Sequence, residues 1–361
     1  MTHQENAPIS ITPGAIRFNT DSMKLEYFRI GSEGGSTSSY AGIGTLAAGE
    51  WVQITTDSPD IQTGGTRAVI AGGYETPGAG DLSSIEYVNI DSTGNATTFG
   101  NLTSARRGAA PMSSRTRAVF AGGYTTSINY VTISSTGAGA NFGSLAISRQ
   151  HIAGLSNSTR GIVAGGYVPS PGGGTDEIEY ITIASEGTPV DFGSLSSNTY
   201  FSGGCGSSTR GLIASNTSLN VNTIEFITIN TLGNAADFGD LTVGKRQDAN
   251  QSASNSIRGI FGGAYAPSGG EAIDYVTIAT LGNAIDFGDM LNDNIYVTGA
   301  SSPTRVCFMG GRTKAPSPAP YSHDTMQYVQ IMSTGNAVDF GNLITDRYSA
   351  AAASNGHGGL G

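Results

Sequence analysis

The sequence predicts an all-β fold, a six-bladed kelch-like β-propeller closed by its C-terminal strand, and three observations support this prediction. A unit of about 48 residues occurs six times between residues 66 and 350. Each unit contains segments in which apolar and polar residues alternate, separated by turns rich in glycine. Glycine supplies 53 of the 361 residues, whereas charged residues make up only 13%. Four short strands in a repeat of this length are typical of a propeller blade.

The composition argues against other repetitive architectures. Glycine does not recur at every third residue, as it does in collagen. The charged heptads of a coiled coil are missing, and the low content of charge is the opposite of the disordered signature. A β-helix remains as a competitor, but its coils are usually much shorter than this repeat.

The most recognisable part of each unit is a Thr-Arg pair followed by an apolar strand and two glycines. It reads TRAVIAGGY at 66–74 and TRGIVAGGY at 159–167, with weaker copies later in the chain. We predict the second strand of each blade here. The arginines of the six copies follow one another at intervals of 43 to 50 residues and are Arg67, Arg117, Arg160, Arg210, Arg258 and Arg305.

A third strand follows, as in IEYVNI at 85–90, because β-branched and aromatic residues alternate there with polar ones. It leads into a turn such as STGNA at 92–96, where we expect glycine and asparagine to supply the positive φ of a hairpin. A segment rich in Ala, Gly and Ser provides the first strand of the next unit. The fourth strand of each unit carries a Phe-Gly pair, at Phe99, Phe142, Phe192, Phe238, Phe287 and Phe340.

The segment after the sixth unit predicts how the ring closes. Arg347 lies seven residues after Phe340, the same interval that separates Arg106 from Phe99. The final segment therefore matches a first strand, and the sequence ends where the second strand of a seventh unit would begin. The stretch before the first Thr-Arg pair does not match a first strand well. We therefore predict a propeller over residues 57–361 whose C-terminal strand completes the first blade and removes exposed edges.

Residues 1–56 do not belong to the repeat. The segment 14–31 reads as two alternating strands around a turn, and 49–54 adds a third strand that holds the only tryptophan, Trp51. Three strands alone are marginally stable. We therefore expect an N-terminal β module for attachment or oligomerisation that packs on the propeller or on a partner chain.

Charge and cysteine usage exclude several classes of function. The net charge is −10 and no run of five basic residues occurs, which argues against binding to nucleic acid or to an anionic membrane. No apolar stretch approaches the roughly 18 residues of a membrane helix, and the first residues carry no signal pattern. Cys205 and Cys307 read as two small buried side chains rather than a disulfide framework, as in proteins assembled in a reducing cytosol.

The repeats resemble known families in two ways. The Gly-Gly strand, the Tyr-containing strand and the arginine ahead of the next blade resemble kelch repeats, although Phe of the Phe-Gly pair stands where kelch has a tryptophan. The pattern over 66–361, as in IDYVTI at 273–278 followed by GNAIDFG at 282–288, is similar to repeats of tail-fibre-like virion proteins of tailed phages, cyanophages among them. Residues 14–54 are similar to a short module found in phage fibre proteins.

This resemblance implies a virion component of a phage tail or fibre, assembled in the host cytoplasm. Its partners would be other virion proteins and a host-surface glycan or envelope protein, and fibres of this kind are commonly homotrimers. A purely structural or decorating component that packs on neighbouring subunits is the alternative. Neither reading involves nucleic acid or membrane insertion.

The six Thr-Arg arginines could pair with acidic residues of the third strands or with carbonyl groups of the blades. The acids in question are Glu86, Glu179, Glu225 and Asp274. We predict a structural role, hydrogen bonding between blades, because charge-assisted bonds are the strong ones. A ring of ligand-binding arginines is the alternative.

Acidic residues also precede several Phe-Gly pairs, and carboxylate oxygens are the ligands that Ca²⁺ prefers. These residues are Asp191, Asp237, Asp286 and Asp339. No loop combines them in the alternating spacing, with a bidentate glutamate, that a calcium loop needs. We therefore interpret them as turn-capping or solvated residues and predict no metal and no cofactor.

Motifs for catalysis are missing from the sequence. The histidines, His3, His151, His323 and His357, occupy unrelated positions of the repeat. No HExxH or GxSxG motif occurs. We predict a binding or structural protein rather than an enzyme, and a glycan-degrading enzyme is the less favoured alternative.

The connections between second and third strands vary most in length and composition, and equivalent loops of a propeller emerge on one face. Variable loops on a rigid scaffold are where recognition usually occurs. The longest connection, 312–325, holds Arg312, Lys314, Tyr321 and His323 among prolines that stiffen it. Because Tyr and Arg are favoured at contacts, we predict a contact surface at these four residues.

Overall fold

The computed structural model describes residues 15–19, 24–30, 49–53, 66–216, 222–244, 252–263, 271–292, 294–313 and 321–360. The chain divides into two compact units, Met1–Gln62 and Thr63–Gly361. In the part of the chain so described, no helix is long and apolar enough to cross a membrane.

The first unit contains a three-stranded antiparallel sheet. Its strands are β1 (Ile16–Asn19), β2 (Lys24–Ile30) and β3 (Gly49–Gln53), in the order β1-β2-β3. Phe28 of the central strand lies opposite Trp51 of β3. The strands fall within the two segments that the sequence predicted to be extended.

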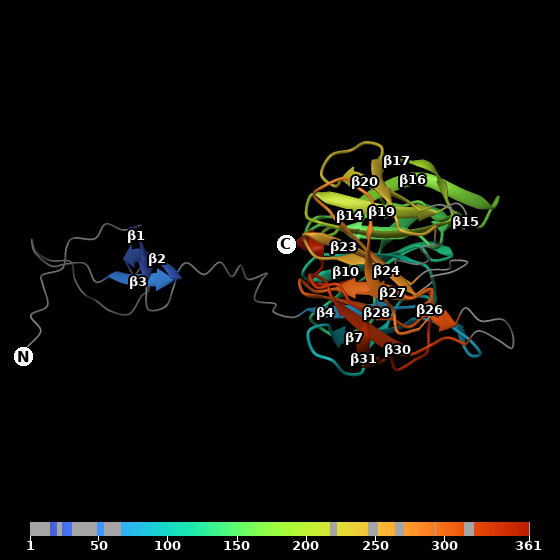
Figure 1. The fold of residues 1–361 in the computed structure, drawn as a ribbon, viewed down its shortest axis with the longest axis horizontal. Coiled ribbons are helices and arrows are strands. Elements are labelled where there is room, and N and C mark those ends of the chain that lie inside the picture. Colours follow the sequence, from blue (N-terminus) through green and yellow to red (C-terminus); the bar gives the residue numbers. More distant parts are fainter. Residues whose placement is uncertain are drawn as a thin grey trace, which may run out of the picture. The chain divides into compact units, whose positions relative to one another are not determined.

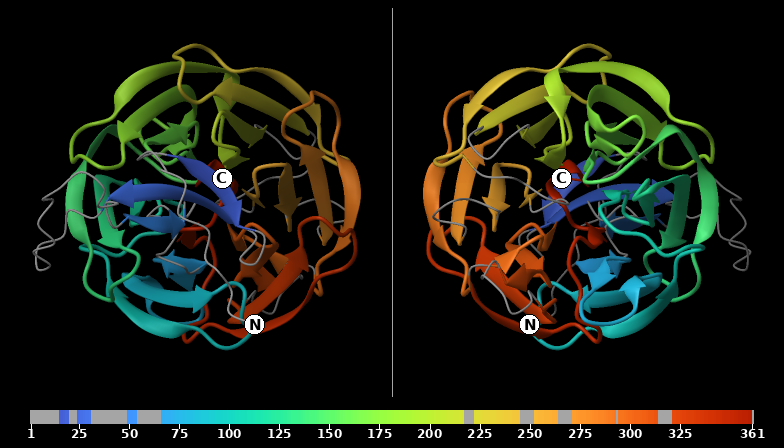
Figure 2. Two further views of the ribbon diagram at one scale, coloured as in Figure 1. Left: turned by 90° about the vertical axis from the view of Figure 1, so that its left-hand side faces the viewer. Right: turned by 90° about the vertical axis from the view of Figure 1, so that its right-hand side faces the viewer.

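The second unit is a β-propeller of six antiparallel blades, as Figure 2 shows along the axis of the ring. Blade 1 consists of β32 (Ala351–Ser354), β4 (Arg67–Ala71), β7 (Ser84–Asn89) and β8 (Thr97–Asn101). Blade 2 consists of β9 (Ala110–Ser113), β10 (Arg117–Ala121), β11 (Thr125–Thr132) and β12 (Ala140–Arg149). Blade 3 consists of β13 (Ala153–Ser156), β14 (Arg160–Ala164), β16 (Gly173–Thr182) and β17 (Val190–Thr199).

The other three blades repeat this arrangement. Blade 4 consists of β18 (Phe201–Gly206), β19 (Arg210–Asn216), β20 (Thr223–Thr228) and β21 (Ala236–Asp240). Blade 5 consists of β22 (Ser252–Ser254), β23 (Arg258–Gly262), β24 (Ala272–Thr277) and β25 (Ile285–Asp289). Blade 6 consists of β27 (Thr298–Ser301), β28 (Arg305–Met309), β30 (Thr325–Gln330) and β31 (Val338–Asn342).

The ring closes through a strand from the C-terminal end of the chain. β32 pairs antiparallel with β4, so that Ala351 lies opposite Ala71 and Ser354 opposite Ala68. The prediction that the final segment completes the first blade is therefore confirmed. The two parts of blade 1 are 250 residues apart in the sequence, from Asn101 at the end of β8 to Ala351 at the start of β32, and their pairing joins the first repeat to the last.

The ring has two faces that differ in the connections they carry. Because neighbouring strands are antiparallel, the second-to-third connections and the links between blades share one end, which we call the loop face. Short strands β5 (Tyr74–Glu75), β6 (Gly80–Asp81), β15 (Tyr167–Val168), β26 (Asn294–Ile295) and β29 (Arg312–Thr313) extend it. The tight turns and the 3₁₀ turn η1 (Gly358–Leu360) lie at the other end, the C-terminal face. Figure 1 shows β15 and β26 opposite the C-terminus.

The apolar core is divided into six clusters, one at each junction of adjacent blades. Between blades 1 and 2, for example, Ile85, Phe99, Phe120 and Val131 pack together. Within each blade the Phe of the Phe-Gly pair meets an aromatic ring of the third strand edge-on, as Tyr87 does with Phe99 at 6.1 Å between centroids. Since the buried surface lies between blades, each blade depends on its neighbours for stability.

Adjacent blades are joined by a backbone contact between the Phe-Gly pair and the next turn. The turn glycine donates its N–H to the Phe carbonyl of the preceding blade, as Gly137 does to Phe99 at 3.0 Å and Gly94 to Phe340 at 2.8 Å. The glycine after the Phe faces the same turn, and a Cβ on Gly100 would lie 2.0 Å from the Gly137 carbonyl oxygen. We call this contact the interblade clasp. Its Phe-Gly glycines are Gly100, Gly143, Gly193, Gly239, Gly288 and Gly341.

The turn asparagines contribute to the clasp in a way the sequence did not suggest. Glycine has the positive φ, +152° at Gly94, whereas the turn asparagines are not among the described residues of positive φ. Asparagine instead supplies an acceptor to the neighbouring blade. The Oδ1 atom of Asn95 accepts from the N–H of Asn342 at 3.0 Å. Our expectation that both residues adopt positive φ was therefore wrong for asparagine.

The Thr-Arg arginines form a second connection between blades. Arg67 stacks on Tyr87 of its own blade, with 4.4 Å from its guanidinium carbon to the ring centroid. Its Nη1 donates to the carbonyl of Ile133 in the next blade at 3.0 Å. The other five arginines repeat both contacts. In chain order from Arg67, the accepting carbonyls belong to Ile133, Ile183, Ile229, Ile278, Ile331 and Ile90.

A separate set of arginines is fully buried at the links between blades. Arg347 donates to the carbonyl of Gly72 at 2.9 Å and pairs with Glu86, while Arg149 pairs with Glu179. In blade 2 Asn129 stands in place of the acid, and burial without a carboxylate partner lowers the pKa of Arg106 to about 10. These side chains fix the Gly-Gly end of the second strand in blades 1, 2 and 3. The set consists of Arg106, Arg149 and Arg347.

The clasp predicts opposite outcomes for two glycines that face each other. Gly100→Ala should destabilise the protein by about 1–3 kcal/mol, because its Cβ would overlap a backbone carbonyl that cannot easily move. Gly137→Ala has open space around its Cβ and should change stability by less than about 1 kcal/mol. Thermal and denaturant unfolding of the two variants measures this difference. Equal destabilisation by both would contradict the clasp.

Candidate functional site

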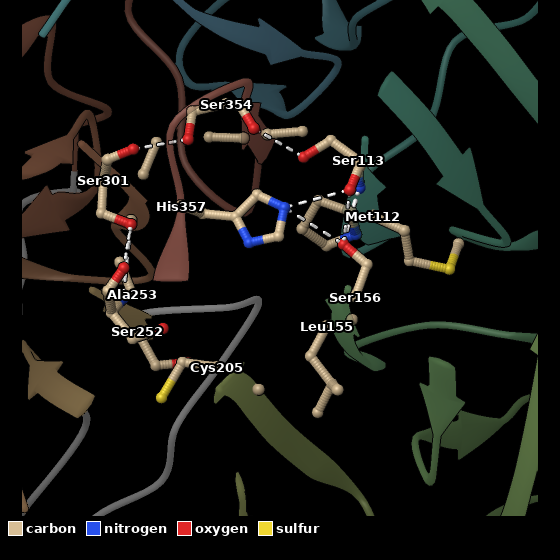
Figure 3. Close-up of a pocket in the computed structure, with 18 of the residues that line it drawn as sticks. Met112, Ser113, Leu155, Ser156, Cys205, Ser252, Ala253, Ser301, Ser354 and His357 are labelled. Atoms are coloured by element: carbon tan, nitrogen blue, oxygen red, sulfur yellow. Dashed lines mark hydrogen bonds between the residues drawn. The ribbon is translucent and has the colours of Figure 1, made fainter. Parts of the chain in front are cut away.

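The centre of the ring is too tightly filled to hold a ligand. The first strands of the six blades line a cavity of only about 50 Å³ with glycine, alanine and serine (Figure 3). A volume of this size holds a water molecule or two rather than a sugar or a cofactor. The central channel is therefore part of the scaffold.

A belt of serine hydroxyls joins the first strands across the channel. Each hydroxyl donates to the carbonyl at the equivalent position of the preceding blade, as Ser113 does to Ser354 at 2.8 Å and Ser301 to Ser254 at 2.7 Å. Blade 4 interrupts the belt, because Gly206 stands at this position. The belt consists of Ser113, Ser156, Ser254, Ser301 and Ser354.

The C-terminal turn packs where the belt is interrupted. A Cβ on Gly358 would lie 2.6 Å from the Gly206 carbonyl oxygen, and one on Gly359 would overlap the carbonyl of Ser156. Figure 3 shows His357 among the belt serines. Its Nδ1 accepts from the N–H of Gly359 at 3.1 Å, so Nε2 carries the proton and donates to the carbonyl of Ser113 at 3.0 Å. The neutral imidazole thus closes the channel at the C-terminal face.

The loop face carries a more open site. A depression of about 190 Å³ lies around the propeller axis, and we call it the aromatic basin. Its residues come from links between blades and from two second-to-third connections, so they belong to five junctions of the ring. The link 245–251, which leads into blade 5, lies outside the described residues. The basin is lined by Arg107, Tyr124, His151, Phe201, Tyr296, Arg312, Tyr348 and Ser349.

The aromatic side chains of the basin contact one another around its wall. Tyr348 lies 5.7 Å from Tyr296 and 5.4 Å from Tyr74, measured between ring centroids. The imidazole of His151 lies 4.8 Å from the ring of Phe201. Such rings give a large and rigid contact area with few rotatable bonds.

Two guanidinium groups stack on these rings. Arg107 lies 4.3 Å from the centroid of Tyr74 and 5.0 Å from that of Tyr124, and it forms an ion pair with Asp81 at 3.5 Å. Arg312 lies 4.7 Å from the centroid of Tyr296. Cation–π contacts of this kind fix the orientation of arginine and leave its N–H groups in the plane of the guanidinium for hydrogen bonding.

Backbone strain in the propeller is concentrated at the basin. Among the described residues other than glycine, four have a positive φ, and all four line this depression. Tyr124 has φ +64°, His151 +53°, Tyr296 +61° and Ser349 +51°. At the equivalent link before blade 2 the residue is Gly108, with φ +64°. A side chain in this conformation costs about 1–2 kcal/mol. At three of these four positions, Tyr124, His151 and Tyr296, the strained residue carries a ring into the basin.

The structure separates the four residues that the sequence predicted as a contact surface. Arg312 lines the basin. Tyr321 is 51% exposed and is not part of the basin lining. His323 lies beside β29, the strand that contains Arg312, with its Nε2 2.6 Å from the hydroxyl of Thr313. Lys314 lies outside the described residues.

Sequence reasoning missed the remaining basin residues. Most of them come from the links between blades, to which the sequence analysis assigned no function. A signal was nevertheless present in the sequence. Arg107 and Tyr348 each come directly after a buried arginine, and His151 comes two residues after one. The residue types differ from unit to unit, so the repeat pattern alone does not single them out.

The other candidate residues do not form a second site. The Thr-Arg arginines lie at successive blade junctions rather than around one cavity. The acidic residues before Phe-Gly, Asp191, Asp237, Asp286 and Asp339, are exposed. Within the described ranges, no group of three or more His, Cys, Asp or Glu side chains could hold a metal ion. Cys205 and Cys307 are buried and unpaired, and burial raises the pKa of the Cys205 thiol to about 12.

His357 makes stability depend on pH. Burial lowers its pKa from 6.5 to about 4 in the folded state, so the unfolded chain binds more protons between these values. Stability should be full above pH 6.5 and should fall by up to about 3 kcal/mol as the pH drops towards 4. His357→Gln should flatten this part of the curve of unfolding temperature against pH. If unfolding temperature varied with pH in the same way in both proteins, this role of His357 would be contradicted.

The strained link before blade 1 predicts a stabilising substitution. Ser349 is buried, has φ +51°, and its hydroxyl has no hydrogen-bond partner. Ser349→Gly removes the strain and the unpartnered hydroxyl, and should raise stability by about 0.5–1 kcal/mol. Thermal unfolding measures the change, with Ser301→Gly in the serine belt as a control that should lower the unfolding temperature.

Comparison of the chain with protein-family models and with curated proteins gives no match. The fold itself is compatible with many functions, because propellers serve as scaffolds for unrelated sites. The aromatic basin is therefore the feature of this molecule that bears most directly on function.

Proposed function

We propose that this protein is a tail-fibre-like component of a phage virion and that the aromatic basin binds a glycan on the host surface. The basin itself carries the proposal, because it gathers rings and guanidinium groups on strained backbone in an open depression. Strain of this kind persists where the side chain serves a function that a glycine would not. The resemblance of the repeats to phage fibre proteins supplies the biological setting.

The chemistry of the basin suits a saccharide. The apolar faces of sugar rings stack on aromatic side chains, and their hydroxyl groups pair with tyrosine, histidine and arginine. Tyr124 is 44% exposed and Tyr348, Tyr296 and Phe201 are partly exposed, so these rings are available to a ligand. A depression of about 190 Å³ suits the end of a glycan chain rather than a long stretch of it.

The lining argues for binding rather than catalysis. Hydrolysis of a glycosidic bond usually requires two carboxyl groups on either side of it. The described residues that line the basin include arginine, tyrosine and histidine but neither aspartate nor glutamate. A modest affinity would suffice on a virion, because several copies on one particle would raise the overall avidity.

A second candidate function is that of a structural or decorating subunit, which exposed apolar residues on the outer strands and turns favour. Ile285 and Val338 begin the fourth strands of blades 5 and 6 and are 58% and 54% exposed. Leu232 and Leu281, in the third-to-fourth turns, are similarly exposed. Such positions could pack against a neighbouring subunit. Imaging of intact virions with the protein labelled would show which face is buried.

The glycan-binding proposal predicts different effects for two exposed tyrosines on the same face. Tyr124→Ala removes a ring from the basin and should weaken binding by about tenfold or more on an array of bacterial surface glycans. Tyr321→Ala, similarly exposed but outside the basin, should change binding by less than about twofold. Loss of binding in Tyr321→Ala alone would place the contact on the loop and contradict the assignment to the basin.

A further inference from the structure

We propose that the basin selects acidic saccharides and that Arg312 binds the carboxylate of the sugar. The inference rests on the glycan-binding function proposed above and specifies its ligand. It begins from an unusual arginine. Arg312 lines the basin, and its Nε is buried without a hydrogen-bond partner.

The other arginine side chains described in the propeller all have an acceptor. The Thr-Arg set donates to carbonyls of the next blade, as Arg305 does to Ile90. The buried set bonds to carbonyls, and two of its members, Arg149 and Arg347, also pair with acids. Arg115 donates to the carbonyl of Leu360. Arg107 has Asp81. Within the described residues, the Arg312 guanidinium forms no ion pair and no hydrogen bond, so a charged donor remains available for a ligand.

The surroundings of Arg312 orient this free charge. Its guanidinium carbon lies 4.7 Å from the ring centroid of Tyr296 and 5.2 Å from that of Tyr348. The backbone is held as well, because Arg312 pairs with Ile295 of β26 and forms a bridge to Ser322. A guanidinium oriented in this way matches a carboxylate, which accepts two parallel N–H bonds.

The charge of the basin favours an anion even though the chain carries a net charge of −10. Two guanidinium groups line it, and the one acid paired with them is Asp81, on Arg107. The acidic side chains Glu75 and Asp346 belong to the same face but not to the lining. The positive charge is thus local, and the surrounding face does not attract anions over a long range.

The aromatic rings specify that the anion is part of a sugar. A free phosphate or sulfate ion would use the arginine but leave the rings of Tyr124, Tyr348 and Phe201 without a contact. A hexuronic or sialic acid presents a carboxylate at the edge of a ring whose faces are partly apolar. One such residue can meet Arg312 with its carboxylate and the tyrosines with its ring.

Matched sugars test this selectivity in the full-length protein. Binding of methyl glucuronide and methyl glucoside, which differ in the carboxylate, is measured by ligand-observed NMR and calorimetry, together with N-acetylneuraminic acid and inorganic sulfate. At least one acidic sugar should bind about tenfold or more tightly than the neutral glucoside. Equal binding of acidic and neutral sugars would overturn the inference and leave the glycan-binding proposal standing. Binding of sulfate in preference to the acidic sugars would also overturn the inference. Binding of none of these sugars, with no signal on a glycan array, would overturn both.

Variants of Arg312 test the residue itself. Arg312→Gln should reduce the preference for the acidic sugar to less than about twofold while affinity for the neutral sugar is retained. Arg312→Lys keeps the charge without the paired N–H groups and should retain an intermediate preference. Tyr124→Ala should weaken binding of acidic and neutral sugars alike. An unchanged preference in Arg312→Gln would overturn the assignment, and unfolding temperatures verify that each variant is folded.

Discussion

The interblade clasp is the constraint on which the rest of the structure depends. At each junction the backbone of a Phe-Gly pair meets the backbone of a turn so closely that no Cβ fits between them. The same contact brings the phenylalanine ring into the apolar cluster of that junction. When the contact is made six times, Gly94 reaches Phe340 and the ring closes without a gap.

This constraint explains how a chain so poor in charge and so rich in glycine holds a rigid shape. The apolar core is distributed over six junctions, so no blade carries a complete core of its own. Closure by β32 then prevents the first blade from being left with an open edge. Stacked arginines such as Arg67 connect each junction on one side of the core. On the other side, three links between blades carry a buried arginine, such as Arg347.

The sequence allowed the blades and the closure to be predicted because the reasons for them are local or repeated. Alternating residues define the third strand, and the interval from Phe340 to Arg347 identifies the closing strand. The basin could not be predicted in this way. Its residues from the links between blades occupy similar positions in the repeat but differ in residue type, as His151 and Ser349 show, and at the equivalent position before blade 2 the residue is Gly108. Only the ring brings them together, and only backbone angles show that His151 occupies a position suited to glycine.

The two faces of the ring therefore differ in structure. The serine belt and His357 close the centre of the ring towards the C-terminal face, whereas the aromatic basin opens on the loop face. The chain also enters the propeller on the closed face, because Thr66, immediately before β4, accepts from the N–H of Ile90 in a tight turn there. If the N-terminal unit attaches the protein to a particle, the point where the chain leaves the ring is on the face opposite the basin.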